Sequence, residues 1–103
     1  MFSENLKSIK KKNTEENIRF SNGTITAYSD GYLKSWEVCL SGVEEFGFLA
    51  GLFNSNNNIN LEFTCQNGKI VYGEVIITLE GVDEFILKGT GPLKYKDNDN
   101  FVI

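Results

Sequence analysis

The sequence contains no histidine, one proline, one arginine and two cysteines in 103 residues. Without histidine, the chain cannot build a Ser-His-Asp or Cys-His nucleophile system or a His-ligated metal site. The run DNDN at 97–100 resembles the start of a calcium loop, but the glycine and distant glutamate that complete such a loop are missing. We therefore expect no metal and no cofactor.

Paired acid and base groups are also scarce. Carboxylates occur in pairs only as sequence neighbours, and neighbours on a strand face opposite sides of a sheet. The motif GTG at 89–91 is followed by too short a segment to open a phosphate-binding helix, so we interpret it as a bend. These absences predict that the protein is not an enzyme and has no catalytic residues.

Long apolar runs are missing as well. The longest uncharged apolar stretch, residues 46–53, is far below the roughly 18 residues that a membrane-spanning helix needs. The N-terminus has no apolar segment typical of a secretory signal. We therefore expect a cytoplasmic protein with no membrane contact, in which Cys39 and Cys65 are reduced and buried as small apolar side chains.

What the chain does have is the composition of a folded domain, with 41% hydrophobic and 13% aromatic residues. Its net charge is −4. Residues 37–84 carry eight acidic side chains against Lys69 alone, whereas residues 1–20 carry a net charge of +2. The acidic body argues against a nucleic-acid partner.

The first 15 residues differ in pattern from the rest. Phe2, Leu6 and Ile9 recur at helical spacing, with Ser3 as N-cap and lysines near the end. This pattern predicts a short basic amphipathic helix over residues 1–15; the alternative is a disordered basic arm. From residue 16 the apolar period is two, so we expect a single β-rich domain over residues 16–103.

Two strong strand patterns lie in that domain. Residues 32–41 alternate, with Trp36, Val38 and Leu40 on the predicted core face. Residues 59–65 alternate strictly, and they precede the dipeptide Asn67-Gly68. That dipeptide favours a two-residue type I′ turn, as Asn22-Gly23 does earlier in the chain.

The turn at Asn67-Gly68 implies a register for the hairpin. A two-residue turn places Cys65 opposite Ile70 and Phe63 opposite Tyr72. Cys65, Phe63 and Tyr72 would then share one face of the sheet. Gly73 would oppose Glu62, where a bulge or a bend is expected.

The whole pattern predicts a mainly β fold of six to eight short strands. With turn signals every eight to twelve residues, we expect a small antiparallel meander that forms a barrel-like or two-layer sheet. Residues 43–53 fit either a helix or a bulged strand, because two glycines interrupt the helical spacing. Strand order is not determined by these patterns.

Function is predicted only by class. The acidic, β-rich chain suits a non-catalytic protein-binding module, such as an inhibitor or immunity-type protein encoded by a phage or mobile element. Such a protein covers a basic surface of its partner, and charge accelerates the encounter. The residues we expect to make that contact are Glu44, Glu45, Asp83 and Glu84.

Two alternatives belong to other classes. The first is a carrier of a small ligand, with a pocket in the curved sheet lined by Trp36, Phe63, Tyr72 and Glu74. The second is a self-assembling structural subunit of the phage type, which would pair through edge strands such as residues 101–103. A homo-oligomer is open at this point: a structural subunit should assemble by itself into a ring or filament, a carrier should be a monomer or small oligomer with its ligand, and an inhibitor should do neither.

Overall fold

The computed structural model describes residues 2–12, 15, 17–30, 33–44, 58–79 and 84–102, without the side chains of Asp30, Leu33 and Leu79. Every regular element in these ranges is a β-strand, which confirms the mainly β class. None of the described residues belongs to a helix long and apolar enough to cross a membrane. The strands are β1 (Phe2–Lys11), β2 (Asn17–Ile18), β3 (Asn22–Asp30), β4 (Leu33–Ser41), β5 (Ile59–Cys65), β6 (Ile70–Leu79), β7 (Phe85–Gly89) and β8 (Lys94–Tyr95).

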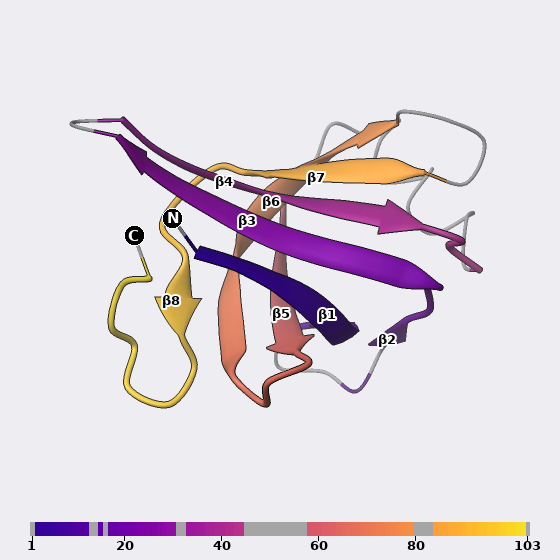
Figure 1. Cartoon of the computed structure of the whole chain (residues 1–103), viewed down its shortest axis with the longest axis horizontal. Helices are drawn as coiled ribbons and strands as arrows, with labels where there is room; N and C mark the ends of the chain where they lie inside the picture. The colour runs from indigo at the N-terminus through magenta and orange to yellow at the C-terminus, as the bar shows by residue number, and fades with distance from the viewer. Residues whose placement is uncertain are drawn as a thin grey trace.

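Six of the strands close into an antiparallel barrel. Their order is β1-β3-β4-β7-β6-β5, and pairing between β5 and β1 completes the ring (Figure 1). β2 extends the sheet beside β1, and β8 pairs with β6. The barrel-like prediction is confirmed, and the order departs from that of a plain meander because β4 pairs with β7 rather than with β5.

The antiparallel order sorts the connections between two ends of the barrel. β1, β4 and β6 run in one direction and end together, so the connections 12–21, 42–58 and 80–84 leave from the same end. The connections 31–32, 66–69 and 90–93 leave from the other end. We call the first the acidic end, for the residues described below, and the second the hairpin end.

The prediction of an N-terminal helix or arm is wrong, because Phe2–Lys11 is a barrel strand. Leu6 lies opposite Cys65 and Ser8 lies opposite Thr64, so Lys7 is an extra residue in the ladder. This β-bulge turns both Leu6 and Ile9 into the core although they are three residues apart. The spacing that resembles a helix is therefore that of a strand with one inserted residue.

The two Asn-Gly predictions are also corrected. Asn22 and Gly23 lie within β3 rather than at a turn. At the second site a hairpin does form, but its loop has three residues: the Gly68 amide donates to the Cys65 carbonyl at 3.0 Å and only Gly68 has positive φ. This is the geometry of a type I turn closed by a left-handed glycine.

The longer loop shifts the register by one residue. Phe63 lies opposite Val71, Leu61 lies opposite Gly73, and Tyr72 lies opposite Glu62. Because side chains alternate along a strand, this slip moves Tyr72 to the outer face of the barrel, away from Cys65 and Phe63.

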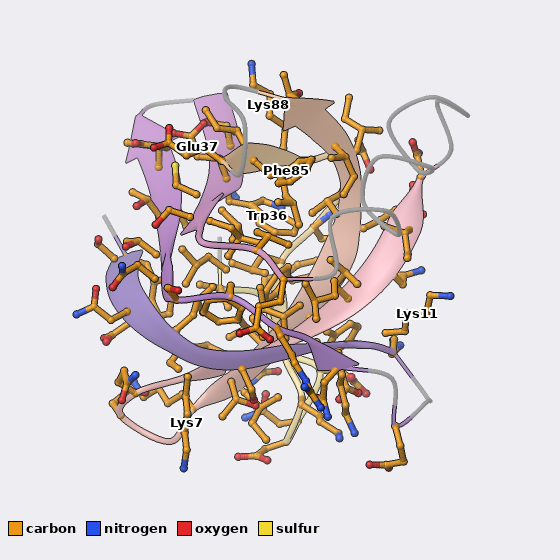
Figure 2. All side chains as sticks on the ribbon, turned by 90° about the vertical axis from the view of Figure 1, so that its right-hand side faces the viewer. Lys7, Lys11, Trp36, Glu37, Phe85 and Lys88 are labelled. Atoms are coloured by element: carbon orange, nitrogen blue, oxygen red, sulfur yellow. The ribbon has the colours of Figure 1, made fainter. Side chains whose placement is uncertain are left out.

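The core fills the inside of the barrel. Trp36, Val38 and Leu40 are buried as predicted, together with Leu87 from the neighbouring strand β7 and Phe63 from β5. Figure 2 shows the alternation: Trp36 and Phe85 lie between the strands, whereas Lys7 and Lys88 point outward. Cys65 is buried as expected, but Cys39 is exposed because it takes the outward position between Val38 and Leu40.

Candidate functional site

The four residues of the predicted ligand pocket do not meet. Trp36 and Phe63 contact each other inside the core, with ring centroids 5.8 Å apart in an edge-to-face arrangement. Tyr72 and Glu74 occupy outward positions on β6, which follows from the one-residue shift in register. The pocket prediction is therefore wrong, and the interior position of Trp36 and Phe63 is a packing position.

The Trp36 indole packs against two glycines. A β-carbon on Gly89 would come within 2.2 Å of the indole, and one on Gly73 would come within 2.6 Å of it. The indole nitrogen donates to the Gly91 carbonyl at 2.8 Å. Gly73 therefore makes room for the ring, instead of marking the bulge or bend that we expected, and the bend at 89–91 accepts the hydrogen bond of the indole.

A charged cluster joins the outer faces of β1 and β5 to the residue that follows β8. The Glu62 carboxylate is 4% exposed, although it points away from the core. The ammonium groups of Lys10 and Lys96 lie 3.5 and 3.2 Å from it. The sequence shows the outward position of Glu62, but it does not show that two distant lysines close over it.

Tyr72 lies beside this cluster. Lys12 places its ammonium group 4.1 Å from the centroid of the Tyr72 ring, and the phenol donates a hydrogen bond to Asp99. That hydrogen bond is the main cause that raises the pKa of Tyr72. With the Lys96–Glu62 pair, these contacts hold the segment from β8 onward against the barrel.

Glu74 also has a structural role. Its carboxylate accepts hydrogen bonds from the Asn58 amide at 2.6 Å and from the Thr90 hydroxyl at 3.1 Å. The Thr90 amide in turn donates to the Glu74 carbonyl at 2.9 Å. Glu74 thus anchors the chain that follows β7 to β6.

The predicted partner-binding acids lie at one end. Glu44 follows β4 and Glu84 precedes β7, and both side chains are exposed. Leu40 pairs with Phe85, so the two segments adjoin at the acidic end. Glu45 and Asp83 lie outside the described residues.

The sequences of the connections differ in charge between the two ends of the barrel. The connections at the acidic end carry Lys12 and Arg19 against seven acidic residues, Glu15, Glu16, Glu44, Glu45, Glu80, Asp83 and Glu84. The connections at the hairpin end carry Lys69 and no acidic residue. Of these acids the structure describes Glu15, Glu44 and Glu84, and Glu15 lies 3.8 Å from Lys10. The strand ends from which the three acidic connections leave lie together at one end of the barrel.

The hairpin end carries a groove. It has a volume of about 460 Å³ and is lined by residues 34–36 on one side and by residues 89–92 and Phe101 on the other. Trp36 contributes its floor and is 3% exposed, whereas Phe101 is 64% exposed. We call this the edge groove, because it runs along β4 where β7 ends.

Within the described parts of the chain, no group of three or more histidine, cysteine or carboxylate side chains is placed to hold a metal ion. No protein-family model matches the chain, and neither a curated protein nor a solved structure matches it significantly. We therefore infer function from the charge and geometry of the two ends of the barrel.

Proposed function

We propose that this protein is a non-catalytic protein-binding module that covers a basic surface of its partner with its acidic end. The observation that carries the proposal is that the three connections whose sequences hold seven acidic residues leave from strand ends at the same end of the barrel. An inhibitor or immunity-type protein, encoded by a phage or mobile element and acting in the cytoplasm, is the specific form that we propose.

The exposed acids supply the contact. Glu44 and Glu84 flank paired strands, so a rigid sheet holds the backbone on which they stand. Charges at the rim of an interface mainly raise the association rate and favour partners of opposite charge. A basic surface of a partner would therefore meet the acidic end early in the encounter.

The test compares two charge reversals of equal size. Native mass spectrometry at low salt, on lysate of the cells that produce the protein, detects complexes of the wild type, of Glu84→Lys and of Asp97→Lys. Both side chains are exposed, but Asp97 lies after β8, away from the acidic end.

We expect a complex of defined mass with a basic protein for the wild type and for Asp97→Lys, and at least about a fivefold smaller yield for Glu84→Lys. Equal loss in both variants would mean that only the net charge matters. A complex that contains only copies of this chain would favour the structural-subunit alternative and contradict the proposal.

A further inference from the structure

The β3–β4 hairpin extends past its neighbours in the barrel. Its two strands pair with each other from Asn22 opposite Ser41 to Asp30 opposite Leu33. β1 pairs with β3 only as far as Ala27, and β7 pairs with β4 only over residues 37–40. The projecting part of the hairpin is visible in Figure 1, where it reaches beyond the other strands.

One edge of this projection is open. In the described part of the chain, no strand pairs with residues 33–36 of β4 on the side where β7 would continue. Thr90 does not follow β4, since its amide donates to the Glu74 carbonyl on β6. An unpaired edge presents alternate backbone N–H and C=O groups, which another strand can use.

The edge groove lies directly along this open edge. Its far wall is residues 89–92, where Gly91 has open space beside its α-carbon and leaves the backbone uncovered by side chains. Phe101 supplies exposed apolar surface, and Trp36, which is 3% exposed, lies beneath it in the lining. The groove therefore combines a strand edge with apolar side chains, the two components of peptide recognition by strand addition.

From these observations we infer that the edge groove binds an extended acidic segment of a partner protein, which adds to β4 in the position where β7 ends. Lys34 is the one charged residue among the described residues that line the groove. The Lys94 ammonium lies 5.1 Å from the centroid of the Phe101 ring, so a second cation borders the same wall. Both charges favour an acidic ligand.

The geometry also defines the ligand pattern. Lys34 and Trp36 are two residues apart and therefore share one face of β4. The added strand carries an acidic residue opposite Lys34 and an apolar residue two positions away, near Trp36 and Phe101. A second copy of this chain fits less well, because antiparallel pairing of the same four-residue edges places Lys34 opposite Ser35 of the other copy and gives it no acidic partner.

This surface is independent of the acidic end, so the two proposals fail separately. The probe is a phage-displayed library of random ten-residue peptides selected on the full chain. The best peptide is then synthesised and titrated, with Trp36, the one tryptophan, as the fluorescence reporter. Amide chemical-shift changes identify the residues that it contacts.

We expect the selected peptides to share an acidic residue and an apolar residue two positions apart, and the shift changes to centre on residues 33–36 and 89–92. Lys34→Glu weakens binding about tenfold, because it replaces an attraction by a repulsion. Lys7→Glu, an equal charge change on β1, and Glu84→Lys, at the acidic end, leave binding unchanged.

A backbone test separates strand addition from side-chain binding. Two versions of the peptide are N-methylated, one at the odd-numbered and one at the even-numbered amides, so that each loses the hydrogen-bond donors of one strand edge only. The version methylated on the edge that faces β4 should lose about fivefold to tenfold in affinity per hydrogen bond, and the other should lose little.

Three results would overturn the inference: no selected peptide, equal effects of the two methylation patterns, or shift changes centred elsewhere. A dimer that Lys34→Glu dissociates would assign the edge to a second copy and would likewise overturn it.

Discussion

The two ends of the barrel differ in how they are built. At the hairpin end, Trp36 packs against Gly73 and Gly89 and donates to the Gly91 carbonyl, so apolar contact and one hydrogen bond join the strands. At the acidic end, Glu44 and Glu84 are exposed on segments that follow or precede the paired strands. Trp36 therefore contributes to stability, whereas Glu44 and Glu84 present charge to solvent.

This difference separates two kinds of mutation. Changes around Trp36 should lower the free energy of unfolding, because they open cavities or force overlaps inside the barrel. Changes of exposed acids should leave that free energy almost unaltered and change association instead. Four predictions test the separation, beginning with the largest expected effect.

Trp36→Ala should lower the free energy of unfolding by about 3–5 kcal/mol, the usual cost of truncating a buried aromatic side chain. Denaturant unfolding followed by circular dichroism measures the change. Tyr28→Ala is the matched control on the adjacent strand, where the ring is 42% exposed, and it should cost less than about 1 kcal/mol. Similar losses in both variants would place Trp36 outside the core.

Gly89→Ala should lower the free energy of unfolding by about 3 kcal/mol, since the added methyl group would lie 2.2 Å from the indole ring. Gly91→Ala has open space around the added carbon and should change stability by less than about 0.5 kcal/mol. The comparison uses the same chemical change two residues apart. A larger loss of stability in Gly91→Ala than in Gly89→Ala would contradict the packing of the Trp36 indole against Gly89.

Each end also carries a cysteine, and the two should differ in titration. Burial raises the pKa of Cys65, at the hairpin end, from 9.0 to about 11. Between these values the thiol of the unfolded chain ionises while that of the folded chain stays neutral, so this contribution to stability is complete below pH 9 and is lost as the pH rises towards 11.

The free energy of unfolding should therefore fall less between pH 8 and pH 10.5 in Cys65→Ala than in the wild type. Cys39→Ala is the control, because its side chain is on the outer face of β4 near the acidic end. The same pH dependence in wild type and Cys65→Ala would show that the buried thiol does not contribute.

Glu84→Lys should change the free energy of unfolding by less than about 0.5 kcal/mol, because the side chain is exposed. The measurement is again denaturant unfolding, compared with Asp97→Lys. A loss above about 2 kcal/mol would mean that the acidic end is held together by its charges, and the contrast between the two ends would no longer hold.

The alternation of apolar residues predicted the strands with the clearest pattern. Trp36, Val38 and Leu40 on β4, and Leu61 and Phe63 on β5, are buried as expected. Those predictions succeeded because a half-buried strand repeats its apolar residues every second position. The prediction failed where one residue was added, at the bulge around Lys7 and in the three-residue loop before Lys69.

The candidate sites depended on information that a linear pattern does not contain. A single extra loop residue placed Tyr72 outside the barrel, and with it the predicted pocket disappeared. The pairing of Leu40 with Phe85, which brings the segments before Glu44 and after Glu84 side by side, and the open edge of β4 follow from strand order, which the sequence patterns leave undetermined. The acidic residues themselves were identified from charge alone, and their role stays a prediction.

The most direct test of the account is zero-length carbodiimide cross-linking of the tagged protein in lysate of the cells that produce it. The reagent joins a carboxylate of this chain to a lysine of whatever it touches, and mass spectrometry identifies both residues. We expect cross-links from Glu44 and Glu84 to lysines of one basic protein. Cross-links from Asp97 or Glu37 in their place, or only between copies of this chain, would contradict the claim that the acidic end is the partner-binding surface.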